Sequence, residues 1–352
     1  MAGFLLSSEE ILSGAGGAPG LKPVGVEVGR LRGRDAARRV REFLSGQPPS
    51  FIVGLHMPLL LLQGVSAPPV VSADPERRRA GREEVARLLD QAVEWGAAYV
   101  LLHFPAPPVL PRARPQWPWR LTDWEPRELQ GPTAVAQHSR EFCGWLEEEA
   151  ARRGLKAYLE GDGPHPHFYR TGLMARLLAE HPGLGFCLNV GQLHLLARLG
   201  GFSFEEAVEA LAPFTAVLHL NNSRHGPQVV ERMVPVHPSQ DPAQGWADVP
   251  AVVRAVVGVR PDCLLKFEQE GVWAEARLVE GRLWVQSLVA GAEPPLGQAV
   301  SRWLEEQPTR ARRGPRGRAR RAAGKRGGGR AATGPRRRGG PASRSGRGGA
   351  GP

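Results

Sequence analysis

The sequence predicts a single (β/α)8 barrel, residues 1–304, followed by a disordered Arg/Gly-rich tail, residues 305–352. Short apolar runs alternate with amphipathic segments of helical periodicity, over a total length that is usual for such barrels. The runs are continuously apolar, as expected for parallel strands that are buried on both faces. An open doubly wound sheet is the alternative, and it is disfavoured because no glycine-rich phosphate loop follows an early strand.

Each element has a recognisable signal. Strands are predicted at residues 3–7, 24–28, 51–56, 98–103, 156–160, 185–189, 216–220 and 264–268. Helices are predicted at residues 74–95, 132–153, 168–180, 204–211 and 248–257. The first helix has clear boundaries, because Asp74 is a typical N-cap, Pro75 suits the first turn and Gly96 ends it. Residues 105–128 and 221–247 contain no clear element, and long loops of this kind often carry binding functions.

The positive net charge belongs to the tail. The chain has 46 Lys and Arg residues and 35 Asp and Glu residues, and 15 of the basic residues follow Thr309 with no acidic residue among them. The body therefore has 31 basic and 35 acidic residues, a net charge of −4, which argues against a general nucleic-acid surface. The tail cannot bury enough apolar surface to order itself, and we expect at most weak, nonspecific contact with nucleic acid through it.

The three cysteines, Cys143, Cys187 and Cys263, are far apart in the sequence. They indicate buried apolar residues in a reducing compartment rather than disulfides or a zinc motif. The N-terminus has no basic segment followed by a long apolar core, and no run approaches the length of a membrane span. We therefore expect a cytoplasmic protein without membrane contact.

Polar residues follow the apolar runs, at positions that face the C-terminal mouth of a barrel. These positions are His56, His103, Glu160, Asn189, His219 and Glu268. Imidazole and carboxylate groups suit transition metals, and two carboxylates beside a divalent ion can move protons next to a carbonyl. Strand alternation also turns Lys266 into the barrel, where Glu27 is a candidate partner.

Four motifs in this order resemble the xylose isomerase-like TIM-barrel superfamily, which includes sugar and sugar-phosphate isomerases and epimerases and the endonuclease IV type of AP endonuclease. The motifs are Leu-Glu-Gly at Glu160, Gly-Phe-Cys-Leu-Asn-Val-Gly-Gln at 185–192, Leu-His-Leu-Asn-Asn at His219 and Lys-Phe-Glu at Glu268. The resemblance implies a divalent metal (Mn, Mg, Zn or Co) held by Glu160, Asn189, His219 and Glu268, with the two Glu residues as acid and base. In the endonuclease branch further histidines hold additional zinc ions, and the similar positions here are His56, His103 and His237.

The sequence departs from the superfamily pattern at Asn189 and Gln192, where the motif usually has Asp-x-x-His. Asn189 can offer a carbonyl oxygen but no charge, and Gln192 is a poor transition-metal ligand. A site with three zinc ions is therefore not expected, whereas a weaker single-metal site is. We expect the substrate to contact His56, His103, Gln192 and Lys266.

These observations lead to three hypotheses. The first is a metal-dependent isomerase or epimerase of a sugar, a sugar phosphate or a related small polyhydroxy compound. The second is a nuclease of the endonuclease IV kind, favoured by the extra histidines and the basic tail and opposed by Asn189, Gln192 and the acidic body. The third is a non-catalytic binding protein on an eroded barrel. Fold alone does not choose among them.

Overall fold

The computed structural model describes residues 2–13, 22–29, 31, 33–57, 68–105, 109–111, 124–126, 130–161, 168–170, 172–226, 229–271 and 273–291. The predicted disordered tail, residues 305–352, lies outside these residues.

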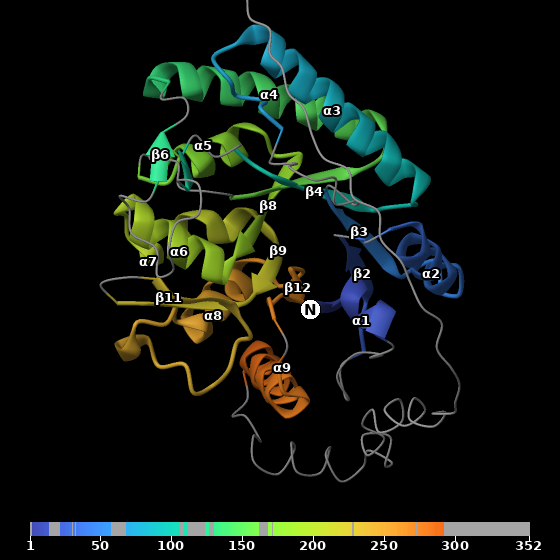
Figure 1. Ribbon diagram of the computed structural model, residues 1–352, viewed down its shortest axis with the longest axis vertical. Coiled ribbons are helices and arrows are strands. Elements are labelled where there is room, and N and C mark those ends of the chain that lie inside the picture. Colours follow the sequence, from blue (N-terminus) through green and yellow to red (C-terminus); the bar gives the residue numbers. More distant parts are fainter. Residues whose placement is uncertain are drawn as a thin grey trace, which may run out of the picture. The chain divides into compact units, whose positions relative to one another are not determined.

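Eight parallel strands form a closed barrel (Figure 1). Their bounds are β1 (Gly3–Ser7), β2 (Gly25–Val28), β3 (Ile52–His56), β4 (Tyr99–His103), β7 (Lys156–Glu160), β8 (Leu184–Asn189), β9 (Thr215–Leu220) and β12 (Leu264–Phe267). Each strand pairs with the next barrel strand along the chain, and β12 closes the ring on β1. The (β/α)8 fold predicted from the apolar runs is confirmed.

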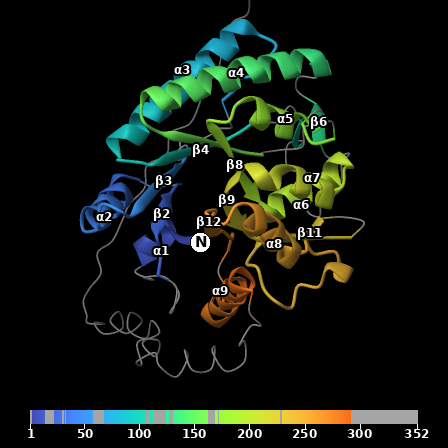
Figure 2. The same ribbon diagram turned by 180° about the vertical axis from the view of Figure 1, so that it is seen from behind.

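Helices lie around the outside of the barrel, as the view from behind in Figure 2 also shows. They are α1 (Ser8–Ser13), α2 (Gly33–Ser45), α3 (Pro75–Glu94), α4 (Pro132–Arg152), α5 (Leu173–Glu180), α6 (Val190–Gly200), α7 (Phe204–Leu211), α8 (Val249–Val259) and α9 (Glu275–Ala290). The helix predicted at 168–180 begins only at Leu173, because Gly172 adopts a left-handed conformation with φ of 65°. At α3 the Asp74 side chain accepts from the Glu76 N–H, as expected of an N-cap.

The prediction that two long segments are loops without regular structure was wrong. Residues 105–128 include β5 (Val109–Pro111) and β6 (Trp124–Pro126), which pair antiparallel. Residues 221–247 include the hairpin of β10 (Asn222–His225) and β11 (Val229–Val234). The sequence did not predict β10 because this strand is polar. Asn222 and Ser223 are nevertheless fully buried, and their side chains form hydrogen bonds with Gln240 and with the Gly191 carbonyl.

The described residues form one large and two small clusters of buried apolar side chains, and one of the small clusters joins Leu195 and Leu199 of α6 to Val229 of β11. The large cluster packs apolar side chains of the barrel strands against the surrounding helices. The other small cluster is formed by Leu5, Tyr99, Leu101, Cys187 and Val217, which have the strand parity of the residues at the mouth. This cluster supports the polar residues at the strand ends. The described part of the chain contains no helix that could span a lipid bilayer.

Candidate functional site

Eight polar side chains gather at the carboxyl ends of the barrel strands. They are Glu27, His56, His103, Glu160, Asn189, His219, Lys266 and Glu268. Register explains part of this gathering, since His103 pairs with Glu160 and His219 pairs with both Asn189 and Lys266 on adjacent strands. Because all eight strands are parallel, residues far apart in the sequence meet at one mouth.

Glu160 and Glu268 are joined by one amide group. The Asn189 Nδ2 donates to Glu160 Oε1 at 2.9 Å and to Glu268 Oε2 at 2.9 Å. The Asn189 oxygen instead accepts from the Gln192 backbone N–H and from Asn221 Nδ2. Asn189 therefore donates toward the carboxylates, and the predicted ligation of a metal by its oxygen would require the amide to turn over.

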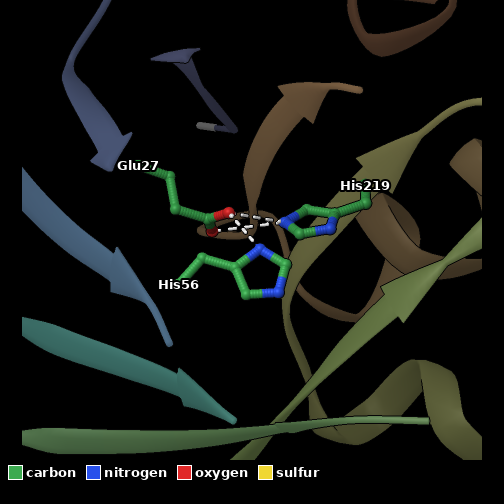
Figure 3. Close-up of side chains that lie close together, drawn as sticks. All are labelled: Glu27, His56 and His219. Atoms are coloured by element: carbon green, nitrogen blue, oxygen red, sulfur yellow. Dashed lines mark hydrogen bonds and ion pairs between the residues drawn. The ribbon is translucent and has the colours of Figure 1, made fainter. Parts of the chain in front are cut away.

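Glu27 links four other residues inside the mouth. Its Oε1 accepts from His219 Nε2 at 2.9 Å and from Lys266 Nζ at 2.8 Å, and its Oε2 accepts from the Tyr99 hydroxyl at 2.9 Å. His56 Nδ1 lies 3.5 Å from Oε1. Figure 3 shows His56 and His219 reaching Glu27 from two other strands. The pairing of Lys266 with Glu27 that strand parity indicated is present in the structure.

Two histidines form the other side of the mouth. The Nε2 atoms of His56 and His103 lie 2.7 Å apart. Glu160 Oε2 lies 3.4 Å from the His56 Nε2 and 3.9 Å from the His103 Nε2. This oxygen is buried and has no hydrogen-bond partner among the described residues. Three potential metal ligands thus point at one another.

The charges of the site follow from this packing. Burial would raise the pKa of Glu160, but the neighbouring charge of His219 lowers it to about 2. Burial would likewise raise the pKa of Glu268, and Lys266 and His219 hold it well below its usual range. Burial would lower the pKa of His219, but Cys187, Glu27 and Glu268 raise it well above the usual value. Burial raises the pKa of the Cys187 thiol and keeps it protonated. The negative charge next to His219 therefore comes from the carboxylates of Glu27 and Glu268.

His237 and Gln192 have different surroundings from those predicted. The His237 Nε2 pairs with Glu280 of α9 at 3.1 Å, and its Nδ1 contacts the Ser239 hydroxyl. His237 is in none of the potential ligand groups formed by the described residues. Gln192 contributes its backbone N–H to the Asn189 oxygen. A metal contact from His237 and a substrate contact from the Gln192 side chain remain predictions.

Glu27 and Tyr99 are part of the network, although the pattern of polar residues after apolar runs does not select them. Glu27 lies within β2 and not after it, and Tyr99 begins β4. A usable signal was present for Glu27, since it is the single charged residue within an otherwise apolar strand. A charge at such a position requires a buried partner.

A cavity of about 110 Å³ lies at the mouth of the barrel and is lined in part by Ser7, Glu27, His56, Lys266 and Glu268. A larger groove, of about 450 Å³, lies between α3 and α4 and is lined by none of the residues at the mouth. We place the candidate site at the smaller cavity, because four titratable groups with perturbed pKa values line it, namely Glu27, His56, Lys266 and Glu268.

The closed ring of eight parallel strands defines the fold class as a (β/α)8 barrel, and solved structures of low sequence identity share this fold. Mannonate dehydratase from Streptococcus suis serotype 2 is similar over 84% of this chain and 98% of its own, with 15% identity and a TM-score of 0.56. The 3-keto-D-glucoside 4-epimerase YcjR from E. coli is similar over 82% of this chain and 100% of its own, with 12% identity and a TM-score of 0.51. The IolI protein, in a structure with a zinc atom, is similar over 86% and 99%, with 12% identity and a TM-score of 0.51. No protein-family model and no curated protein matches the sequence.

Proposed function

We propose that this protein is a metal-dependent isomerase or epimerase of a sugar, a sugar phosphate or a related small polyhydroxy compound. The observation that carries the proposal is the pair of carboxylates, Glu160 and Glu268, held by one Asn189 nitrogen at the mouth of the barrel. Both have a lowered pKa and are ionised at neutral pH, so each can accept a proton. An epimerase among the similar structures, 3-keto-D-glucoside 4-epimerase, supports the same class.

The residues on the histidine side fit a divalent metal ion such as Mn, Mg, Zn or Co. His56, His103 and Glu160 would hold it, since two imidazole nitrogens and an unpartnered carboxylate oxygen face one another there. Burial lowers the pKa of His56, which keeps this imidazole neutral, as a metal ligand must be. A bound ion would polarise a substrate carbonyl.

The side chains can carry the protons in a closed cycle. Glu268 takes a proton from the substrate carbon next to the carbonyl, and the C–H electron pair moves into an enediolate. Glu160 returns a proton to carbon after receiving one from His219, whose Nδ1 lies 3.7 Å from Glu160 Oε1. The proton on Glu268 then passes back to His219 Nδ1, 3.2 Å from Glu268 Oε2. Glu27 supports the charged imidazole from its other side.

Exchange of substrate hydrogen with solvent tests this proposal. The purified protein, supplied with each divalent ion in turn, is incubated in D₂O with a panel of ketoses, aldoses and their phosphates. We expect deuterium at the carbon next to the carbonyl, detected by NMR, and its loss in Glu268→Gln and in Glu160→Gln. Glu280→Gln is the matched control, because Glu280 pairs with His237 outside this cluster, and it should retain exchange.

Metal analysis is the second arm of the test. We expect one divalent ion per chain and its loss in the double variant His56→Ala/His103→Ala. Undiminished exchange in Glu268→Gln would remove that residue from the acid–base role. A protein that binds no divalent ion under any supplement would contradict the metal-dependent class.

An endonuclease IV-like nuclease is a second candidate, and the facing pair His56 and His103 is the observation in its favour. It predicts two or three zinc ions per chain and cleavage of DNA at abasic sites. The Asn189 amide turned toward Glu160 and Glu268 argues against several ions at this mouth. A non-catalytic binding protein would show neither exchange nor cleavage.

A further inference from the structure

The side chain of Asn189 is fixed in one orientation. Asn189 is the N-cap of α6, and its Oδ1 accepts from the Gln192 backbone N–H at 3.1 Å. A backbone N–H can only donate, so the oxygen of this amide must face the helix. Asn221 Nδ2 donates to the same oxygen at 2.7 Å. The Asn189 nitrogen is therefore turned toward the centre of the mouth.

Asn221 lies in a tightly packed space, in which its Oδ1 has no hydrogen-bond partner among the described residues. Asn221 is fully buried directly after β9, and its Oδ1 lies against Gly191 in the first turn of α6. A Cβ at Gly191 would overlap this oxygen, so a side chain there would displace Asn221. The glycine at position 191 and the buried amide at position 221 thus together hold Asn189 in place.

The consequence falls on the space between Glu160 and Glu268. The Asn189 nitrogen carries two hydrogens, donates one to each carboxylate at 2.9 Å, and has no lone pair available to a cation. A divalent ion between the two carboxylates would meet these N–H groups. Turning the amide over would set its N–H groups against the Gln192 N–H and would leave that partly buried donor without its acceptor.

We propose that Asn189 bridges Glu160 and Glu268 in the place of a cation, so that no divalent ion binds between these two carboxylates and an ion on the side of His56 and His103 lies outside this space. Asn189 is then a positioning residue that keeps two ionised carboxylates close together through neutral hydrogen bonds. The bridge stands on the contacts of Asn189 alone, whereas the assignment of an ion to the histidine side rests on the proposed function.

Asn189→Asp tests the bridge, because it exchanges a donor for a charged acceptor of the same shape. The measurement is calorimetric titration with Mn²⁺ and with Zn²⁺ in the His56→Ala/His103→Ala background, where the histidine side cannot contribute. We expect no tight binding while Asn189 is present. Adding Asn189→Asp should create one site, with affinity at least tenfold higher and with a thermal midpoint that rises when the ion is added.

The outcomes separate the bridge from the proposed function. If the protein with all its native residues binds no ion but Asn189→Asp does, the metal of the proposed function fails and the bridge stands. If His56→Ala/His103→Ala retains a tight ion while Asn189 is present, and both Glu160→Gln and Glu268→Gln then remove it, the ion lies between the two carboxylates and the bridge is overturned.

A second measurement needs no variant, in case Asn189→Asp does not fold. Crystals of the native-sequence protein are soaked in ZnCl₂ and the zinc is located by anomalous scattering. Zinc confined to the histidine side, or no zinc at the mouth, agrees with the bridge. A zinc peak between Glu160 and Glu268 contradicts it.

Discussion

The ammonium group of Lys266 lies 2.8 Å from Glu27 Oε1, so β12 and β2 are joined by an ion pair across β1, which lies between them. Both side chains are buried, with exposed fractions of 8% for Lys266 and 0% for Glu27. A buried pair costs desolvation of both ions, but removal of one partner leaves an uncompensated charge in the interior. The pair therefore forms a closing contact of the barrel rather than a surface salt bridge.

We predict that Lys266→Met lowers the free energy of unfolding by about 3–5 kcal/mol, because buried Glu27 then keeps its charge after losing one of its two main cationic partners, His219 being the other. The double variant Glu27→Gln/Lys266→Met should be less destabilised than the sum of the two single variants, by more than about 1 kcal/mol. Urea unfolding of the four proteins measures this. Arg38→Met is the control: Arg38 pairs with Asp35 and Glu42 on the surface of α2, and its loss should cost less than about 1 kcal/mol. Additive single effects would mean that Glu27 and Lys266 do not stabilise each other.

The close approach of β3 to β4 gives a second prediction. A Cβ on Gly54 would overlap the ring of Tyr99, whose hydroxyl donates to Glu27. Gly54→Ala should therefore lower the free energy of unfolding by about 1–3 kcal/mol or more, since this is the usual cost of overpacking a core. Thermal unfolding measures it, and the loss should be smaller in a Tyr99→Leu background, which makes room for the methyl group.

The matched control for Gly54 is Gly258 in α8, where an added Cβ meets nothing within 4 Å. Gly258→Ala should leave stability unchanged or raise it by up to about 1 kcal/mol, because alanine loses less conformational entropy in a helix. Equal changes in stability for Gly54→Ala and Gly258→Ala would show that overlap of the added methyl group with the Tyr99 ring does not destabilise the protein.

The basic tail gives a third prediction, which rests on composition alone. Deleting residues 310–352 removes 15 basic residues and no acidic ones. We expect weak binding to a labelled DNA or RNA oligonucleotide to disappear, and the thermal midpoint to stay the same, because this segment has too little apolar content to add to a core. Fluorescence anisotropy at increasing salt measures the binding. Oligonucleotide binding that survives the deletion would place the contact on the barrel and would favour the nuclease hypothesis.

The sequence predicts the barrel well because its strands are buried on both faces and therefore appear as continuous apolar runs. It also predicts which strand ends meet, since parallel strands in a closed barrel bring their carboxyl ends to one mouth. Strand parity places Lys266 inside the barrel, with Glu27 as a candidate partner. The orientation of Asn189 could not be predicted. It depends on Asn221, 32 residues further along, whose position is set by tertiary packing. The pairing of His237 with Glu280 likewise depends on where α9 packs.

The last prediction concerns two stacked histidines outside the site, His194 on α6 and His225 on β10, with ring centroids 4.3 Å apart. Neither ring nitrogen of His225 has a hydrogen-bond partner among the described residues, and burial, with the charges of His194 and Arg198, lowers its pKa to about 3. The folded state thus favours neutral His225, and this contribution to stability is complete above pH 6.5 and is lost as the pH falls toward 3.

His225→Phe keeps a ring in the stack and removes the unpartnered nitrogens, so it should be neutral or slightly stabilising at pH 7.5. Its advantage over the native sequence should grow as the pH is lowered from 6.5 to 5, as measured by thermal midpoints. His219→Phe is the contrasting control, because it removes the imidazole that pairs with Glu27, and it should be strongly destabilising. A constant difference between His225→Phe and the native sequence across this pH range would show that His225 takes up its proton as readily in the folded state as in the unfolded state.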